Sequence, residues 1–174
     1  EYVVLQTAKH LIARGHRLQV LTTGDPRQDQ FEGVPVTRLP MSRYRFNLAW
    51  REVAARARSV DLIHAFSNHA AHPAARAGQV AGRPAVLGVL ALFGAVWRDT
   101  RGPVVGRLFQ AFERHLLRLP VGRRVFLSAE SLLLAQDQGL ARADDVVLAP
   151  GISLEDYGPA EHKNGVMFSG KLDA

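Results

Sequence analysis

The spacing of apolar residues changes along the chain between two periods, one typical of helices and the other of strands. Between Val3 and Ile12 apolar residues recur every three or four positions, which predicts an amphipathic helix. Gly15 follows and suits a helix C-cap, because glycine readily adopts the left-handed backbone conformation. The next segment, 18–23 (LQVLTT), alternates apolar with polar residues and includes β-branched side chains, which predicts a strand.

This succession of helices and strands continues along the chain. Further strands are predicted at 34–40, 60–66, 85–93, 123–128, 144–151 and 165–170. Further helices are predicted at 47–59, from about Pro73 to Gly78, at 103–119 and at 129–139. Strands that alternate with helices are typical of βα units around a parallel sheet, so the sequence predicts an α/β fold.

Single residues mark several of these boundaries. Pro35 has no N–H to donate to a neighbouring strand, so we expect strand 34–40 towards a sheet edge. Asn47 is expected to cap the helix that follows it. Pro103 suits the first turn of a helix, and Gly139 is expected to end the helix before it.

The stretch 59–77 (SVDLIHAFSNHAAHPAARA) joins an apolar strand to a cluster of polar side chains. The strand holds His64, and the polar residues that follow it are Ser67, Asn68, His69 and His72. Open α/β sheets bind ligands at the carboxyl ends of their strands, so this loop is a candidate ligand site. The alternatives are a turn without chemistry and, for His64, a core histidine whose hydrogen bonds are satisfied within the protein.

Composition narrows the classes of function. The chain has no cysteine, which excludes disulfides, zinc–thiolate sites and cysteine nucleophiles. Its formal net charge of +6 comes mostly from arginine and favours anionic partners such as nucleotide phosphates, although an Arg- and Ala-rich proteome explains it equally well. No apolar run approaches the roughly 18 residues that span a bilayer, and no secretory signal is visible, so we expect a cytoplasmic protein.

The absence of several known short motifs excludes further classes of protein. The sequence contains no GxGxxG, no GxxxxGK[ST] and no GxSxG, so it lacks the signatures of dinucleotide binding, of the P-loop and of α/β-hydrolases. His69 and His72 are spaced closely enough to share a metal ion. No third ligand is apparent nearby, so we expect no metal site.

Four segments, in this order, resemble one enzyme family. They are EYVVLQTAKHLIARGHRLQVLTTGDP, VDLIHAFS, RRVFLSAESLLLAQDQGL, and VVLAPGISLEDYGP with the GVMFSGKLD that follows. Together they resemble the retaining, nucleotide-sugar-dependent glycosyltransferases of the GT-B fold, in the α-mannosyltransferase and sucrose-synthase-like group. In that family two Rossmann-like domains face each other across a cleft, with the acceptor bound mainly by the first and the nucleotide-sugar by the second.

The resemblance implies a domain division. Residues 1–149 are similar to the acceptor-binding Rossmann-like domain, a parallel sheet with helices on both faces. Residues 150–174 are similar to the interdomain link and the first strand of the donor-binding domain. The family's opening strand and its glycine-rich loop would precede Glu1, so we expect that the sheet lacks a strand and that these residues alone are inactive.

The resemblance also implies site residues. Glu1 matches the acid after the glycine-rich loop, and His64 matches the first histidine of the family's pair, while Phe66 stands where the second is expected. His69 or His72 could supply an imidazole from the same loop, and we take His69 as the other catalytic candidate. The remaining expected contacts are Ser67, Asn68 and His72 in the acceptor cleft, and Gly151, Gly170 and Lys171 on the donor side.

The activity that the resemblance implies is transfer of a hexose to a hydroxyl acceptor with retention. The donor would be a UDP- or GDP-hexose used as substrate, with no cofactor, and the acceptor a lipid or a glycan. No nucleic-acid partner is expected. Two alternatives stay open, namely a nucleotide-sugar epimerase of the same fold and a non-catalytic Rossmann-like binding or scaffold domain.

Two segments combine arginines with apolar and aromatic residues, at 43–58 and 103–118. Basic amphipathic helices of this kind can bind anionic membranes, so one interpretation is peripheral contact with the inner face of a membrane. The alternative is that their apolar stripes, such as the one from Val105 to Leu119, pack on the sheet and the arginines are solvated.

Overall fold

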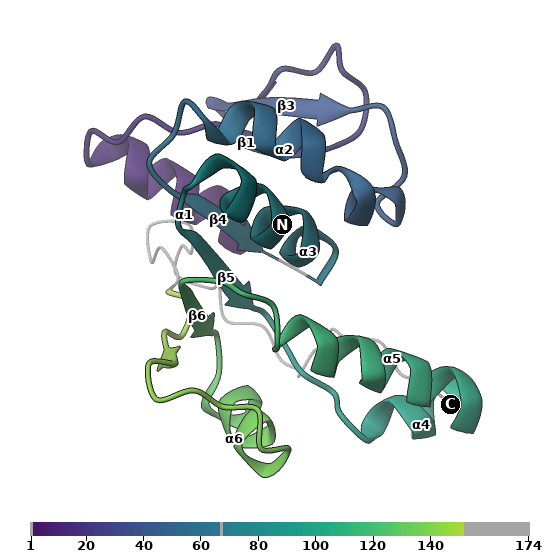
Figure 1. The fold of residues 1–174 in the computed structure, drawn as a ribbon. Helices are drawn as coiled ribbons and strands as arrows, with labels where there is room; N and C mark the ends of the chain where they lie inside the picture. Colours follow the sequence, from purple (N-terminus) through teal and green to yellow (C-terminus); the bar gives the residue numbers. More distant parts are fainter. Residues whose placement is uncertain (1, 67, 152–174) are drawn as a thin grey trace, which may run out of the picture.

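The computed structural model describes residues 2–66 and 68–151 as alternating helices and strands (Figure 1). The elements follow in the order α1 (Tyr2–Ala13), β1 (Val20–Thr23), β2 (Gln30–Phe31), β3 (Val34–Leu39), the 3₁₀ helix η1 (Arg45–Leu48), α2 (Trp50–Ala57), β4 (Ile63–Phe66), α3 (Asn68–Ala81), β5 (Ala85–Val89), α4 (Val96–Arg101), α5 (Pro103–Leu116), β6 (Arg123–Phe126), α6 (Ala129–Asp137) and β7 (Val146–Val147). The predicted α/β fold is confirmed.

The described strands form two sheets. The larger has the order β4-β5-β6-β7, and every neighbouring pair in it is parallel. The smaller has the order β1-β3-β2, with β1 parallel and β2 antiparallel to β3. Within the described residues β1 and β4 each pair on one side alone. The expectation that a strand is missing before Glu1 stays a prediction.

The main core lies between the four-stranded sheet and the helices that follow its strands. Leu87 and Phe126 from the sheet pack with Ala71 and Ala75 of α3 and with Leu116 of α5. Small residues let α3 approach the sheet closely. Gly78 lies against the residues that lead into β5, since an added Cβ there would lie 2.8 Å from the backbone oxygen of Arg83 and 3.3 Å from Cβ of Ala85.

A buried ion pair links β6 to the segment before β7, at the side of this sheet opposite β4. Arg124 on β6 and Asp145 before β7 have side chains that are 0% and 1% exposed, and Nε of the arginine donates to Oδ1 at 2.8 Å. The same guanidinium donates to the backbone oxygens of Leu117 and Leu140, at 2.6 and 2.9 Å. One side chain thereby joins β6 to the end of α5 and to the segment before β7, and each of its three nitrogens has an acceptor within the core.

Several expected boundaries are confirmed. Gly15 has φ of 86° and Gly139 has φ of 65°, the left-handed conformation expected where α1 and α6 end. Pro103 begins α5, and the apolar run after Pro84 forms the buried strand β5. No helix among the described residues is long and apolar enough to cross a membrane.

Three expectations were wrong. The helix predicted from Pro73 begins at Asn68, because the polar residues of the loop occupy its first turn, where N–H groups need no partner within the helix. Strand β3 lies between two others although it contains Pro35, since Val36 supplies the N–H that bonds Asp29 O at 2.8 Å. Asn47 caps no helix; Ala49 precedes α2 without a side-chain cap.

Candidate functional site

The carboxyl ends of β4, β5 and β6 lie at one edge of the four-stranded sheet (Figure 1). In the parallel register Phe66 pairs with Gly88, and Val89 pairs with Phe126. The segments that leave this edge are the start of α3, the loop 90–95 and residues 127–128. Ligands of open α/β sheets bind at such an edge, and the candidate residues of the sequence follow β4 there.

Two histidines near the start of α3 are held by Asn47, a residue of η1. The side-chain Nδ2 of Asn47 lies 3.1 Å from Nδ1 of His69. The backbone oxygen of the same asparagine lies 3.2 Å from Nδ1 of His72. Both imidazoles are half-buried, and Tyr44 packs edge-on against the ring of His69. The segment before α2 therefore fixes both rings at the edge of the sheet.

The hydrogen-bond partners of these two rings place the proton on a different nitrogen in each ring. Asn47 Nδ2 is a donor and also bonds Tyr44 O at 3.0 Å, so Nδ1 of His69 is the acceptor and its proton sits on Nε2. The partner of His72 is a carbonyl oxygen, so Nδ1 of that ring carries a proton, and in the neutral imidazole Nε2 is then the acceptor. The pair therefore offers one N–H donor and one basic nitrogen.

The surroundings of His69 favour its neutral form. Burial lowers the pKa of His69 below its ordinary value of 6.5, and the positive charge of Arg43 lowers it further. The hydrogen bond from Asn47 also lowers the pKa, because a protonated Nδ1 would place its N–H against the N–H of the Asn47 amide. A neutral imidazole at neutral pH can take part in hydrogen bonding to a sugar or acceptor hydroxyl.

His64 lies on the other face of β4, beside Phe66. The two residues are two positions apart, their ring centroids are 4.0 Å apart, and Ala65 between them points into the core that α3 covers. Part of the His64 side chain stays exposed, yet burial lowers its pKa below 6.5. Among the described residues no hydrogen bond or ring contact joins His64 to His69, so the two catalytic candidates do not act on each other directly.

Phe66 fills the position where the resemblance led us to expect a second imidazole. Its ring lies over β5, where a Cβ added to Gly88 would be 3.1 Å from Cδ1 of Phe66. Gly88 thus makes room for the aromatic ring. A glycine inside an apolar strand is a sequence signal of such a close approach.

Glu113 of α5 is a buried acid at this edge that the sequence analysis did not single out. Its carboxylate accepts from the backbone N–H of Phe93 at 3.1 Å and of Gly94 at 2.9 Å. Ser131 Oγ accepts from the N–H of Leu92 at 3.3 Å. The loop after β5 is therefore fixed by side chains of α5 and α6. The signal in the sequence that could have identified Glu113 is a single acid among the apolar residues of α5.

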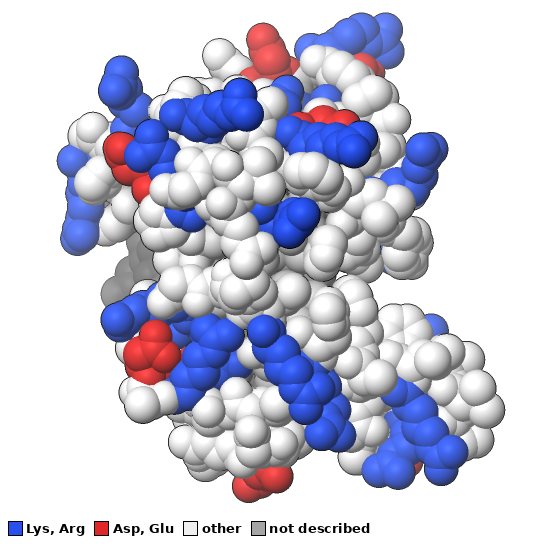
Figure 2. All heavy atoms as spheres, in the orientation of Figure 1, with Lys and Arg blue, Asp and Glu red and all other residues white. Residues whose placement is uncertain are grey.

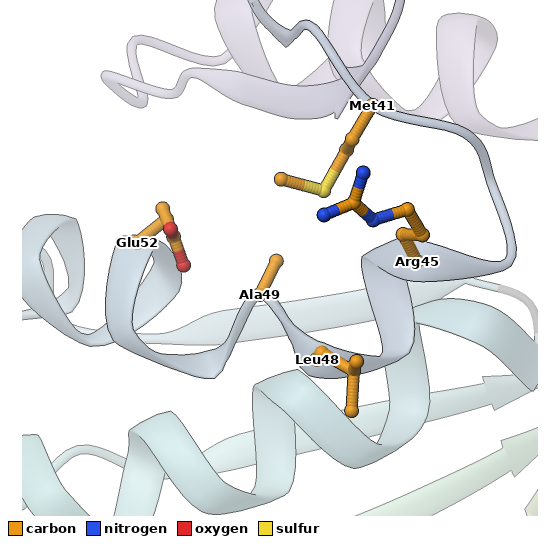
Figure 3. Close-up of a pocket in the computed structure, with 5 residues that line it drawn as sticks. All are labelled: Met41, Arg45, Leu48, Ala49 and Glu52. Atoms are coloured by element: carbon orange, nitrogen blue, oxygen red, sulfur yellow. The ribbon is translucent and has the colours of Figure 1, made fainter.

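Two surface hollows lie away from the candidate histidines. One of about 170 Å³ lies beside η1 and is lined by Met41, Arg45, Leu48, Ala49 and Glu52 (Figure 3). A second, of about 200 Å³, adjoins Ala85 at the amino end of β5, opposite the candidate edge. Neither is lined by the candidate histidines.

The other predicted site residues divide into two groups. Asn68 is the half-buried first residue of α3, and Gly151 is exposed after β7. The remaining predicted residues lie outside the described part of the chain: Glu1, Ser67, Gly170 and Lys171. Within residues 2–66 and 68–151 no three acidic or histidine side chains are grouped as metal ligands.

Comparison with known proteins identifies the family. No curated protein matches the chain. The family model described as a glycosyl transferase 4-like domain matches residues 1–151, which include the four-stranded sheet, its carboxyl edge and the Asn47–His69 contact. This chain belongs to the family of glycosyl transferase 4-like domains, which are domains of GT-B glycosyltransferases.

Proposed function

We propose that this chain is the acceptor-side domain of a retaining glycosyltransferase that moves a hexose from a nucleotide diphosphate to a hydroxyl acceptor. The observation that carries the proposal is the pair His69 and His72, held by Asn47 at the carboxyl edge of the sheet within the family domain. The donor is a UDP- or GDP-hexose, and the acceptor a lipid or glycan in the cytoplasm.

The roles we propose for the two histidines follow from their protons. Nε2 of His72, left as a base, accepts the hydrogen bond of the acceptor hydroxyl, and Nε2–H of His69 donates to a sugar oxygen. Neither group needs to ionise at neutral pH, which fits a reaction whose main demand is orientation and stabilisation of the leaving diphosphate. For the donor side we propose contacts from Gly151, Gly170 and Lys171.

A second candidate is a binding domain of the same fold without catalysis. Phe66 favours it, because a phenyl ring has neither the donor nor the acceptor that an imidazole would bring to that position. On this view His69 and His72 still bind a sugar or glycan, and no bond to the sugar breaks.

The test uses the full-length protein that carries this chain. It is incubated with UDP- and GDP-hexoses, with and without lipid or glycan acceptors, and release of the nucleotide is measured. We expect acceptor-dependent release. The variants His69→Gln and His72→Gln should lose about tenfold to a hundredfold in turnover, since each removes a positioned hydrogen-bonding group. The exposed His10, replaced in the same way, is the matched control.

Each result is informative. Binding of nucleotide-sugar or glycan without any nucleotide release contradicts the transferase and supports the binding domain. Inversion at C2 of the free nucleotide-sugar supports an epimerase. If His69→Gln and His72→Gln behave like His10→Gln, the histidine pair has no role in the reaction.

A further inference from the structure

Helices α4 and α5 form a hairpin that extends away from the end of β5 (Figure 1). They pack closely because Gly106 has no side chain; a Cβ there would lie 2.4 Å from the backbone oxygen of Trp97. The indole of Trp97 stacks on Phe109 at 4.8 Å and contacts Phe93 at 4.7 Å between ring centroids. Aromatic contacts therefore help to hold the two helices of the hairpin together.

The apolar stripe of α5 is divided between two environments. Its C-terminal part packs on the core, with Leu116 only 4% exposed. Its N-terminal part does not, since Val104 is 71% and Leu108 67% exposed, and these two residues share one face of the helix. Other exposed apolar residues of the hairpin are Val96, Val105 and Phe109. The alternative that the whole stripe packs on the sheet does not hold for this half.

Arginines border this apolar face. Residues 96–118 contain five arginines and two acids, and one of these acids, Glu113, is buried against the amides of the loop after β5. Arg107 and Arg114, both exposed, lie seven positions apart and so on the same side of α5. Figure 2 shows the basic side chains among uncharged surface at the lower right, over α4 and α5.

We propose that the α4–α5 hairpin docks on an anionic lipid bilayer. Exposed Val104 and Leu108 enter the boundary between headgroups and acyl chains, and Arg107 and Arg114 bind lipid phosphates from the rim. Long arginine side chains suit this position, because their stems cover apolar surface while the guanidinium stays at the headgroups. A neutral apolar partner would leave these flanking charges uncompensated, so the charges argue for an anionic surface.

This surface is distinct from the candidate site, and its docking does not depend on glycosyl transfer. The two are connected through the loop 90–95, which Glu113 of α5 binds. A docked hairpin would hold the carboxyl edge of β5 close to the bilayer. The proposal is therefore tested by binding and not by turnover.

The experiment measures flotation of the full-length protein with vesicles. One set is phosphatidylcholine alone, and the other contains about one third phosphatidylglycerol. We expect binding to the anionic vesicles at low salt, much weaker binding at raised salt, and little binding to the neutral set. Tryptophan fluorescence, to which both Trp50 and Trp97 contribute, gives a second readout of binding.

Matched variants locate the surface. Leu108→Glu should abolish flotation, and its control is Leu133→Glu on α6, where the leucine is also more than half exposed. Arg107→Gln with Arg114→Gln should weaken binding about fivefold for each charge. The control for this pair is Arg14→Gln with Arg17→Gln, two exposed arginines beside the end of α1.

Three outcomes overturn the proposal. The first is absence of binding to anionic vesicles at low salt. The second is equal loss of binding in Leu108→Glu and in Leu133→Glu, which would mean that the hairpin is not the surface. The third is self-association in solution that Leu108→Glu abolishes while vesicle binding persists, because the apolar face would then meet a second copy of the chain.

Discussion

Asn47 and His69 are joined by a 3.1 Å hydrogen bond between Nδ2 and Nδ1. The amide orientation is fixed by Tyr44, whose backbone oxygen lies 3.0 Å from Nδ2 and needs a donor. The reversed amide would place two acceptors against each other. Thus a residue outside the predicted loop decides which nitrogen of the candidate imidazole carries the proton.

The first prediction concerns this proton. Nitrogen NMR of the histidine rings should show His69 with its proton on Nε2 at neutral pH, and a pKa below 6.5. Replacing Arg43 with Gln removes one of the two causes of the lowered pKa, so the pKa of His69 should rise while burial still holds it down. A proton on Nδ1 in the unaltered protein would contradict the orientation of Asn47.

The second prediction compares two adjacent acids. Asp145→Ala leaves the guanidinium of Arg124 buried without its carboxylate, and we expect a loss of about 3–5 kcal/mol in the free energy of unfolding. Asp144→Ala, at an exposed position, should change it by less than about 0.5 kcal/mol. Urea denaturation followed by fluorescence measures both. Similar losses for the two variants would mean that the buried pair does not stabilise the fold.

The sequence predicted most of this fold because its apolar residues recur at intervals that clearly distinguish helices from strands. Strand β5 and helix α6, with the glycine at the end of α6, follow from pattern and turn chemistry alone. The two-residue strand β2 and the six-residue helix α4 were missed, since segments this short carry too few apolar positions to show a period.

The site was predicted less completely, for a different reason. The loop after β4 could be placed at the sheet edge because parallel strands share that edge. The contacts of Asn47 and Glu113 join segments about twenty residues apart in the chain. Such pairing depends on how η1 and α5 pack, and no local pattern encodes it. From its neighbours in the sequence alone, Asn47 was predicted to cap a helix.

The third prediction tests the close contact within the hairpin. Gly106→Ala places a Cβ within 2.6 Å of three backbone atoms of α4, so the two helices must separate. We expect lower stability and a changed environment of Trp97, although alanine favours helix by about 1 kcal/mol relative to glycine. Gly122→Ala is the matched control, because its nearest neighbour is at 3.5 Å, an ordinary contact. An unchanged Trp97 spectrum in Gly106→Ala would contradict the packing.

The fourth prediction concerns the acid that holds the loop after β5. Glu113→Gln turns one carboxylate oxygen into an amide donor facing the N–H groups of Phe93 and Gly94. The expected cost is about 1–3 kcal/mol in the free energy of unfolding, with faster hydrogen exchange at those two amides. Glu130→Gln, an exposed acid in the first turn of α6, serves as control. Unchanged exchange at Phe93 and Gly94 would show that the carboxylate does not hold the loop.

The fifth prediction is a pH dependence of stability. Burial lowers the pKa of folded His64 below 6.5, so the unfolded chain takes up a proton more readily than the folded one. The free energy of unfolding should therefore be constant well above pH 6.5 and fall as the pH drops through 6.5 towards the lowered pKa. Urea denaturation at about pH 7.5 and about pH 5.5 measures the slope. His64→Gln should reduce it, and adding His69→Gln should reduce it further, because the pKa of that imidazole is lowered as well. Stability that rises as the pH falls over this range would contradict the lowered pKa of both imidazoles.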